Sequence, residues 1–108
     1  MKVLILGSTG MAGNMIVKYF KQKTTHEILT MSRTEGFICD VVKDTDKLVA
    51  YIQEQKPDVV INCIGMLIKE CNDNLDKAKY VNGLFPHIIA RACDTIQAKF
   101  IHISTDCI

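Results

Sequence analysis

Glycines placed between a short apolar run and an amphipathic segment limit the folds open to this chain. Residues 3–6 (VLIL) are continuously apolar, which is typical of a strand buried on both faces. From residue 11 to about residue 23, apolar side chains recur at helical spacing. Gly7, Gly10 and Gly13 stand where this strand would turn into this helix, at a GxxGxxG spacing. The context favours a dinucleotide-binding turn over a turn with incidental glycines.

Each glycine would serve a separate physical purpose in such a turn. Gly7 permits the sharp turn out of the strand, and Gly10 lets the backbone approach a pyrophosphate without a Cβ in the way. Gly13 allows the helix to pack tightly on the strand. The N-terminus of the helix then offers free N–H groups and a partial positive charge to the phosphates. We therefore predict that residues 7–13 bind the diphosphate of a dinucleotide.

The remainder of the chain alternates short apolar runs with longer amphipathic ones, which predicts an α/β fold with a parallel sheet covered on both faces. Residues 59–63 form the strongest β run and should lie centrally. Residues 75–96 carry a long helical pattern in which Pro86 requires a kink or a break. Right-handed crossovers would give a Rossmann-like, doubly wound sheet of about five strands in the order 3-2-1-4-5. Further strands are expected at 27–31, 37–39 and 99–104, and a further helix at 45–55.

Length and charge narrow the class of protein. The 108 residues contain no linker or repeat, so we expect one domain over residues 1–108. Thirteen basic and twelve acidic side chains leave a charge of +1, which predicts no nucleic-acid partner and no membrane surface partner. The absence of a signal peptide or membrane span in the pattern predicts a cytoplasmic protein. Five cysteines and three histidines lack zinc-ligand spacing, so we expect reduced core thiols and no metal site.

The end of the second expected strand bears on the choice of cofactor. An NAD site would place an acidic residue there, but residues 31–34 read MSRT. Arg33 instead supplies a forked donor that suits a 2′-phosphate. We therefore predict NADPH, with NADH as the alternative cofactor and a solvated surface arginine as the alternative reading of Arg33.

Three further motifs fall at the carboxyl ends of expected strands, the edge where open α/β sheets bind ligands. They are Asp40-Val41, residues 62–65 (NCIG) and residues 104–107 (STDC). With the glycine turn, they resemble the N-terminal part of the extended short-chain dehydrogenases/reductases. Within that group the chain is most similar to the dTDP-4-dehydrorhamnose reductases and related sugar-nucleotide reductases. The resemblance covers the whole chain and is most specific in residues 7–13, 57–65, Val81-Asn82 with Pro86, and 102–107.

The resemblance implies an NADPH-dependent reduction of the 4-keto group of a dTDP-6-deoxyhexose, a nucleotide-sugar used for polysaccharide synthesis. It implies that the Thr105 hydroxyl bonds the substrate carbonyl while a Tyr of a YxxxK motif protonates it. Gly10, Met11 and Ala12 would contact the pyrophosphate, Asp40 and Val41 the adenine, and Ile64, Gly65 and Met66 the ribose and nicotinamide. The cofactor-binding set is completed by Gly7, Thr9, Gly13, Ser32, Arg33, Cys63 and Ile103, and the substrate-binding set is Ser104, Thr105 and Asp106.

The chain departs from the family pattern because it lacks the YxxxK motif that would supply the proton donor at the expected position. It stops at Ile108, before the region that would carry YxxxK and the substrate domain, so we expect a part of a larger reductase that is inactive alone. Residues 19–23 (YFKQK) match the motif, but they lie on the first expected helix, whose end points away from the strand ends. An exposed sheet edge could favour self-association into a homo-oligomer.

Two other functions fit the same residues. One is a noncatalytic dinucleotide-binding or regulatory module, like the reductase-like regulatory subunit of methionine adenosyltransferase. The other is a nucleotide-sugar epimerase or dehydratase, which would usually retain NAD and against which Arg33 argues mildly. His102 alternates with Ile101 and Ile103 and is expected to be a packing histidine rather than a base.

Overall fold

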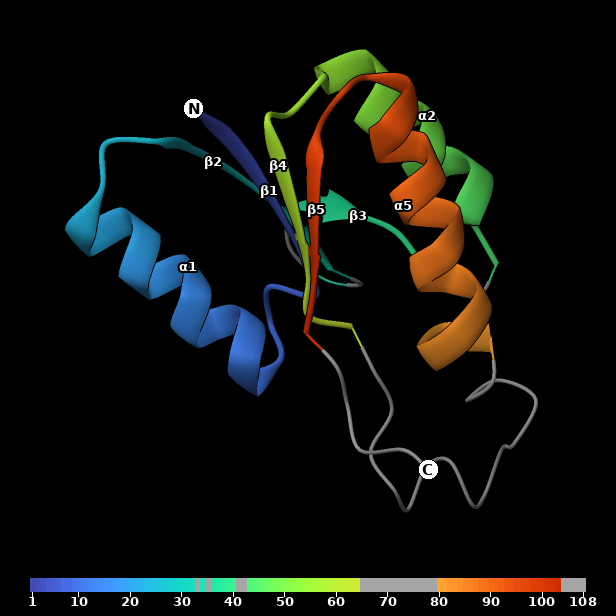
Figure 1. Cartoon of the computed structure of the whole chain (residues 1–108). Helices are drawn as coiled ribbons and strands as arrows, with labels where there is room; N and C mark the ends of the chain where they lie inside the picture. The colour runs from blue at the N-terminus through green and yellow to red at the C-terminus, as the bar shows by residue number, and fades with distance from the viewer. Residues whose placement is uncertain (33, 35, 41–42, 65–79, 104–108) are drawn as a thin grey trace.

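A computed structural model describes residues 1–32, 34, 36–40, 43–64 and 80–103. In these residues, parallel strands form one sheet in the order β3-β2-β1-β4-β5, which confirms the predicted Rossmann-like fold (Figure 1). Helix α1 (Met11–Lys23) covers one face, and α2 (Thr45–Gln55) and α5 (Phe85–Thr95) cover the other. The strands are β1 (Lys2–Leu6), β2 (Glu27–Ser32), β3 (Phe37–Ile38), β4 (Val59–Asn62) and β5 (Lys99–His102).

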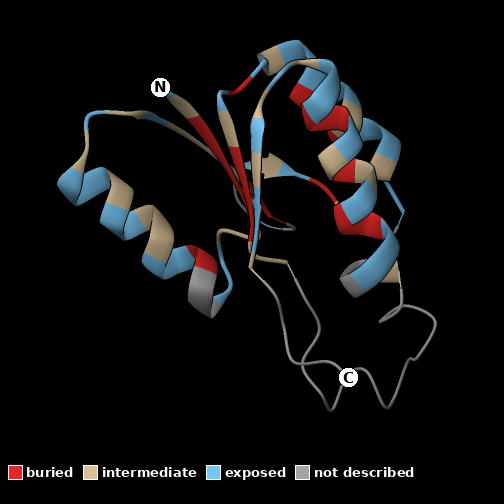
Figure 2. Ribbon diagram, in the orientation of Figure 1, coloured by how far each residue is buried: buried red, intermediate tan, exposed pale blue. Residues whose placement is uncertain are grey.

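Strand β1 lies at the centre of the sheet because its side chains are apolar on both faces. Residues 3–6 are each no more than 1% exposed, and Figure 2 shows this buried segment between the helical layers. A strand covered on both faces has no solvent side, so its sequence need not alternate with polar residues. Strand β4, rich in β-branched residues, pairs with β1 and lies centrally as predicted.

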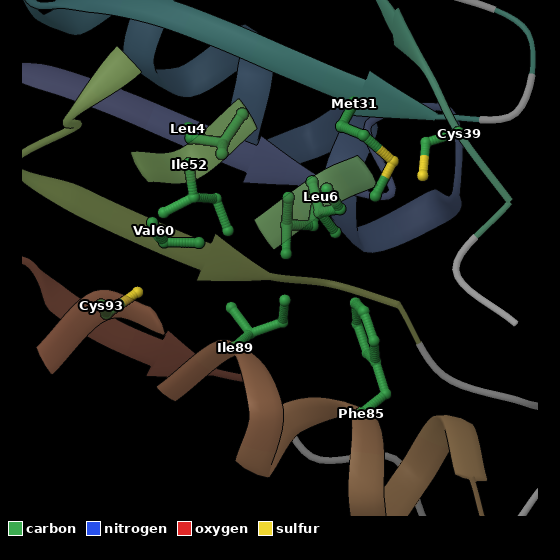
Figure 3. Close-up of a cluster of buried hydrophobic side chains, with 10 residues drawn as sticks. Leu4, Leu6, Met31, Cys39, Ile52, Val60, Phe85, Ile89 and Cys93 are labelled. Atoms are coloured by element: carbon green, nitrogen blue, oxygen red, sulfur yellow. The ribbon is translucent and has the colours of Figure 1, made fainter. Parts of the chain in front are cut away.

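Two apolar layers cover the faces of the sheet. Successive side chains of a strand point to opposite faces, so β1 contributes to both layers. Beneath α1, the buried residues Val3, Ile5 and Ile61 contact partly buried side chains of the helix. The larger layer lies beneath α2 and α5 (Figure 3) and comprises Leu4, Leu6, Met31, Cys39, Leu48, Ile52, Val60, Phe85, Ile89 and Cys93.

The junction between α2 and β4 fixes the amino ends of the central strands. Lys56 adopts a left-handed conformation (φ 48°) and donates its N–H to the Ile52 carbonyl at 2.9 Å. Pro57 follows at once and cannot continue the helix. Next, Asp58 accepts the Lys2 N–H on Oδ2 at 2.8 Å and donates its own N–H to the Lys2 carbonyl at 2.8 Å. These bonds align β1 with β4.

The segment predicted as one long helix changes its helix type just before Pro86. Residues 75–79 lie outside the described residues, residues Tyr80–Leu84 form a π-helical segment (η1), and α5 begins at Phe85. Pro86 is the second residue of α5. The backbone stays helical through Leu84 (φ −68°, ψ −42°), so in place of the expected kink or break the segment changes from π-helix to α-helix beside Pro86. The Tyr80 hydroxyl shares a hydrogen bond with the Thr45 hydroxyl, which joins η1 to the start of α2.

Several strands are shorter than the apolar pattern predicted. Strand β3 ends at Ile38, β4 at Asn62 and β5 at His102, although apolar residues follow each of them. Backbone pairing weakens where the chain leaves the sheet for a loop, and side-chain patterns do not report that point. In the part of the chain that the structure describes, no helix is long and apolar enough to cross a membrane.

The burial of Ile52 leads to a prediction about stability. Ile52 on α2 is 0% exposed, so the Ile52→Ala variant should lower the free energy of unfolding by about 3 kcal/mol through lost burial and a cavity. Urea denaturation measures this change. The control Ile38→Ala removes the same atoms from a side chain that is 58% exposed and should cost under about 1 kcal/mol. Equal losses in the two variants would contradict the described core.

Candidate functional site

The carboxyl ends of four strands lie level with one another. Leu6 of β1 is the register partner of Met31 in β2 and of Asn62 in β4, and Asn62 is the partner of His102 in β5. Because the strands are parallel, the segments that follow them all leave the sheet at one edge, the lower edge in Figure 1. This is the edge at which open α/β sheets bind their ligands.

Predicted cofactor residues come directly after this level row. Gly7, Ser32, Cys63 and Ile103 each follow a residue of the row. Three of them continue the sheet's hydrogen bonding by one residue, so the sheet itself fixes their backbones. The bonds run from Gly7 N–H to the Met31 carbonyl (2.8 Å), from Cys63 N–H to the Leu6 carbonyl (3.0 Å) and from Ile103 N–H to the Asn62 carbonyl (3.0 Å).

Gly7 makes the turn out of β1 possible. Its φ is +78°, a left-handed conformation that L side chains rarely adopt. The space for a side chain is also filled, because a Cβ on Gly7 would lie 2.9 Å from Ile64 Cγ1 and 3.3 Å from the Ile64 nitrogen. Gly7 is therefore required by its backbone conformation and by the loop after β4, which packs against the turn.

Gly13 and Gly10 differ in what the chain demands of them. A Cβ on Gly13 would overlap the carbonyl oxygen of Gly7, so only glycine lets α1 begin this close to the turn. A Cβ on Gly10 would meet nothing nearer than the Gly7 oxygen at 3.5 Å, and Gly10 has a φ of −72° that any residue adopts. Nothing inside the described chain therefore requires glycine at position 10.

The start of α1 carries the partial positive charge of a helix N-terminus. Asn14 donates its N–H to the Gly10 carbonyl at 2.8 Å, the first bond of the helix. The N–H groups before it have no partner within the helix. Among the residues that the structure describes, no side-chain hydrogen bond caps this end, and the first turn of α1 holds no acidic residue. The predicted residues Thr9, Met11 and Ala12 lie here, Thr9 exposed, so their backbone can face an anion at the sheet edge.

Asn62 holds the loop after β4, a role that the sequence reasoning missed. Its side chain is 0% exposed and its Oδ1 accepts the N–H of Ile64 at 3.0 Å. Its Nδ2 lies 3.0 Å from Nδ1 of His102. His102 also stacks on Phe100, as expected of a packing histidine, yet the residue is exposed. The sequence feature that could have indicated this role is the polar Asn62 at the end of the most apolar strand.

The adenine end of the predicted site lies beside β2 and β3. Ser32 is 4% exposed, and its Oγ accepts the N–H of Thr34 at 3.2 Å. Asp40 lies in the turn into α2, where its carbonyl accepts the Asp44 N–H at 2.7 Å and its Oδ1 accepts the Lys43 N–H at 3.4 Å. Ser32 is the last residue of β2 and Asp40 follows β3, so both lie at the carboxyl ends of strands, the same sheet edge as the glycine turn. The predicted site residues Arg33, Val41, Gly65, Met66, Ser104, Thr105 and Asp106 lie outside the described residues.

Comparison with known proteins identifies the family. The sequence model described as the RmlD substrate binding domain matches residues 1–108, the whole chain. The chain belongs to this family. It is 31% identical over 106 residues to a dTDP-4-dehydrorhamnose reductase of Mycolicibacterium smegmatis, covering 97% of this chain and 30% of that protein. It is 28% identical over 108 residues to methionine adenosyltransferase 2 subunit beta of Xenopus laevis, covering 97% of this chain and 32% of that protein.

Solved structures agree with this assignment. A hypothetical dTDP-4-dehydrorhamnose reductase from Sulfolobus tokodaii superposes with a TM-score of 0.86 at 29% identity, over 98% of this chain and 40% of that one. A dTDP-4-dehydrorhamnose reductase from Bacillus anthracis, in complex with NADP, gives a TM-score of 0.78 over 92% of this chain and 34% of that one. At 19% identity the latter shows the fold alone. The RmlD-family chain thus spans about a third of the length of the relatives it matches.

The thiols of this RmlD-family chain do not favour nucleophilic chemistry. Cys39, Cys63 and Cys93 are free. Burial raises the pKa of Cys63, which lies at the sheet edge. Burial, and then the nearby charge of Asp94, raise the pKa of Cys93 to about 11. A thiol with a raised pKa holds little thiolate at neutral pH, so Cys63 and Cys93, among the cysteines that the structure describes, are poor nucleophiles.

The Tyr-x-x-x-Lys match of residues 19–23 lies away from the site, as predicted. Helix α1 starts at the glycine turn and runs back along the sheet, and soon after its end Glu27 donates its N–H to the Met1 carbonyl at 2.9 Å. Met1 precedes β1, so this end of α1 lies at the opposite sheet edge. Tyr19 is 59% exposed there and cannot serve a substrate at the carboxyl ends.

The contrast between Gly13 and Gly10 can be tested through stability. Gly13→Ala should lower the free energy of unfolding by about 2 kcal/mol, because its Cβ would displace α1 from the Gly7 carbonyl. Gly10→Ala should cost under about 1 kcal/mol, the effect of a poorer helix N-cap. Thermal and urea unfolding report both values. A larger loss for Gly10→Ala than for Gly13→Ala would contradict the described turn.

Proposed function

We propose that this chain is the NADPH-binding part of a reductase that reduces the 4-keto group of a dTDP-6-deoxyhexose. One observation carries the cofactor part of the proposal: Gly10 is the glycine of the turn that the described chain does not need. Gly7 and Gly13 have steric reasons within the protein, whereas the open space beside Gly10 suits the close approach of a diphosphate. The uncapped start of α1 adds N–H donors and positive potential at the same place.

The residues at the sheet edge fit a nicotinamide dinucleotide. The bound cofactor would supply a hydride from its nicotinamide ring. The backbone at the start of α1 would hold the diphosphate, and Asp40 would lie by the adenine. Cys63 and Ile64, fixed by the sheet and by Asn62, would line the nicotinamide side. The protein's contribution is thus orientation by backbone groups that the fold holds in place.

The choice of NADPH depends on the residues after β2. Ser32 is the last residue of this strand and is buried. Arg33 is therefore the first residue after the strand whose side chain would contact a substituent of the ribose. The absence of a carboxylate in residues 31–34 favours a 2′-phosphate over free ribose hydroxyls. The Bacillus anthracis reductase, which shares this fold, is in complex with NADP.

Catalysis is assigned to the segment after β5. The Thr105 hydroxyl would donate a hydrogen bond to the keto oxygen as hydride addition makes that oxygen negative, with Ser104 and Asp106 contacting the sugar. The proton that completes the alcohol would come from a tyrosine elsewhere in the parent protein, since Tyr19 lies at the opposite edge. Similarity to the reductase of Mycolicibacterium smegmatis supports this reaction class.

A noncatalytic, regulatory role is the second candidate. The similarity to methionine adenosyltransferase 2 subunit beta covers 97% of this chain, so the same fold occurs in a protein named as a subunit of another enzyme. The two roles predict different results in an activity assay of the parent protein. Reduction of a 4-keto sugar nucleotide with consumption of NADPH would favour the reductase, whereas tight dinucleotide binding without turnover would favour the module.

Cofactor binding can be tested on the chain itself. We expect NADPH to bind with a measurable Kd by nicotinamide fluorescence, and Gly10→Ala to raise that Kd at least about tenfold, because a Cβ would keep the diphosphate from the backbone. Arg33→Ala should weaken NADPH but not NADH. Gly83→Ala is the matched control, since a Cβ there meets nothing within 4 Å.

Two results would count against the proposal. Equal Kd values for Gly10→Ala and the unmodified chain would show that the diphosphate does not bind at this turn. If Arg33→Ala weakens the binding of NADPH and NADH equally, Arg33 does not contact the 2′-phosphate, and other residues determine the choice of cofactor.

A further inference from the structure

A buried amide joins the loop after β4 to an exposed histidine of β5. The backbone N–H of Ile64 can only donate, so the Asn62 atom facing it at 3.0 Å must be the acceptor Oδ1. The amide nitrogen Nδ2 then faces Nδ1 of His102, also at 3.0 Å. Asn62 is 0% exposed, so water cannot replace either partner without a rearrangement.

This geometry selects one tautomer of the neutral His102 imidazole. Because Nδ2 of Asn62 is a donor, Nδ1 of His102 must accept, and the neutral imidazole carries its proton on Nε2. A second proton can bind only at Nδ1, where it would place two donors against each other. Rotating the Asn62 amide would restore the bond to His102 but turn the NH₂ group toward the Ile64 N–H. Protonation therefore removes one of the two bonds in either arrangement.

Ile64 matters because it abuts the glycine turn, its nitrogen 3.3 Å from where a Gly7 Cβ would be. We propose that Asn62 and neutral His102 are positioning residues that hold Ile64 against the glycine turn, and that protonation of His102 loosens this loop and weakens dinucleotide binding. The inference rests on the proposed cofactor site. It adds a pH dependence that the cofactor site alone does not require.

Among the described residues, the other titratable groups near β5 make no hydrogen bond or ion pair with His102. The elements packed against β5 are β4 and α5. In the described part of these elements, and in the residue after β4, no hydrogen bond or ion pair joins a charged or titratable side chain to His102. The groups concerned are Cys63, His87, Arg91, Cys93 and Asp94, together with Lys99 of β5 itself.

The test measures NADH affinity between about pH 8 and about pH 5.5, the range in which histidine changes charge. NADH is the probe because the 2′-phosphate of NADPH would titrate in the same range. For the unmodified chain, Kd should rise about fivefold toward acid pH, the effect of one lost hydrogen bond. In His102→Asn, Oδ1 can accept from Asn62 at every pH, so Kd should stay constant. His87→Asn, at an exposed histidine of α5, is the matched control and should behave like the unmodified chain.

Amide hydrogen exchange of Ile64 supplies a readout that needs no ligand. Its protection factor should fall toward acid pH in the unmodified chain and stay constant in His102→Asn. A protection factor that does not change with pH, or the same rise in Kd in both proteins, would overturn the inference. If protection falls as expected but NADH binds at no pH, the proposed cofactor site is wrong, while the hold of Asn62 and His102 on Ile64 stands.

Discussion

The close approach of Gly13 to the carbonyl of Gly7 determines where α1 begins. Since no Cβ intervenes, the first turn of the helix lies directly against the turn that leaves β1. From that point the helix runs across the sheet and packs Ile16, Val17 and Phe20 against the layer that contains Val3 and Ile5. A displaced helix start would move both the apolar contacts of α1 and the free N–H groups at its N-terminus.

The central strands give this contact a rigid support. Strand β1 is buried on both faces, and the apolar layers on either side allow it little movement. Neighbouring strands hold the backbones of Gly7, Cys63 and Ile103 by ladder hydrogen bonds. The described part of the candidate site therefore consists mainly of backbone groups at the sheet edge, and we expect it to be sensitive to substitution of its glycines.

Sequence patterns predicted the features that depend on local chemistry. The apolar run of β1 and the GxxGxxG spacing both follow from the conformational limits of a few adjacent residues, and the strand order follows from right-handed crossovers. The pairing of Asn62 with His102 was not predictable in this way, because the residues are distant in the chain and meet only when β4 and β5 pair. The π-helical segment Tyr80–Leu84 also escaped prediction, since its apolar spacing differs little from that of an α-helix.

Backbone amide NMR of the chain during titration with NADPH tests the central claim most directly, namely that the glycine turn and the loop after β4 form one dinucleotide site. We expect the largest shift changes at the amides of residues 7–14 and of Ile64, with those of the distal half of α2 unchanged. Saturable binding that leaves the amides of residues 7–14 unshifted, or no binding at any accessible concentration, would contradict it.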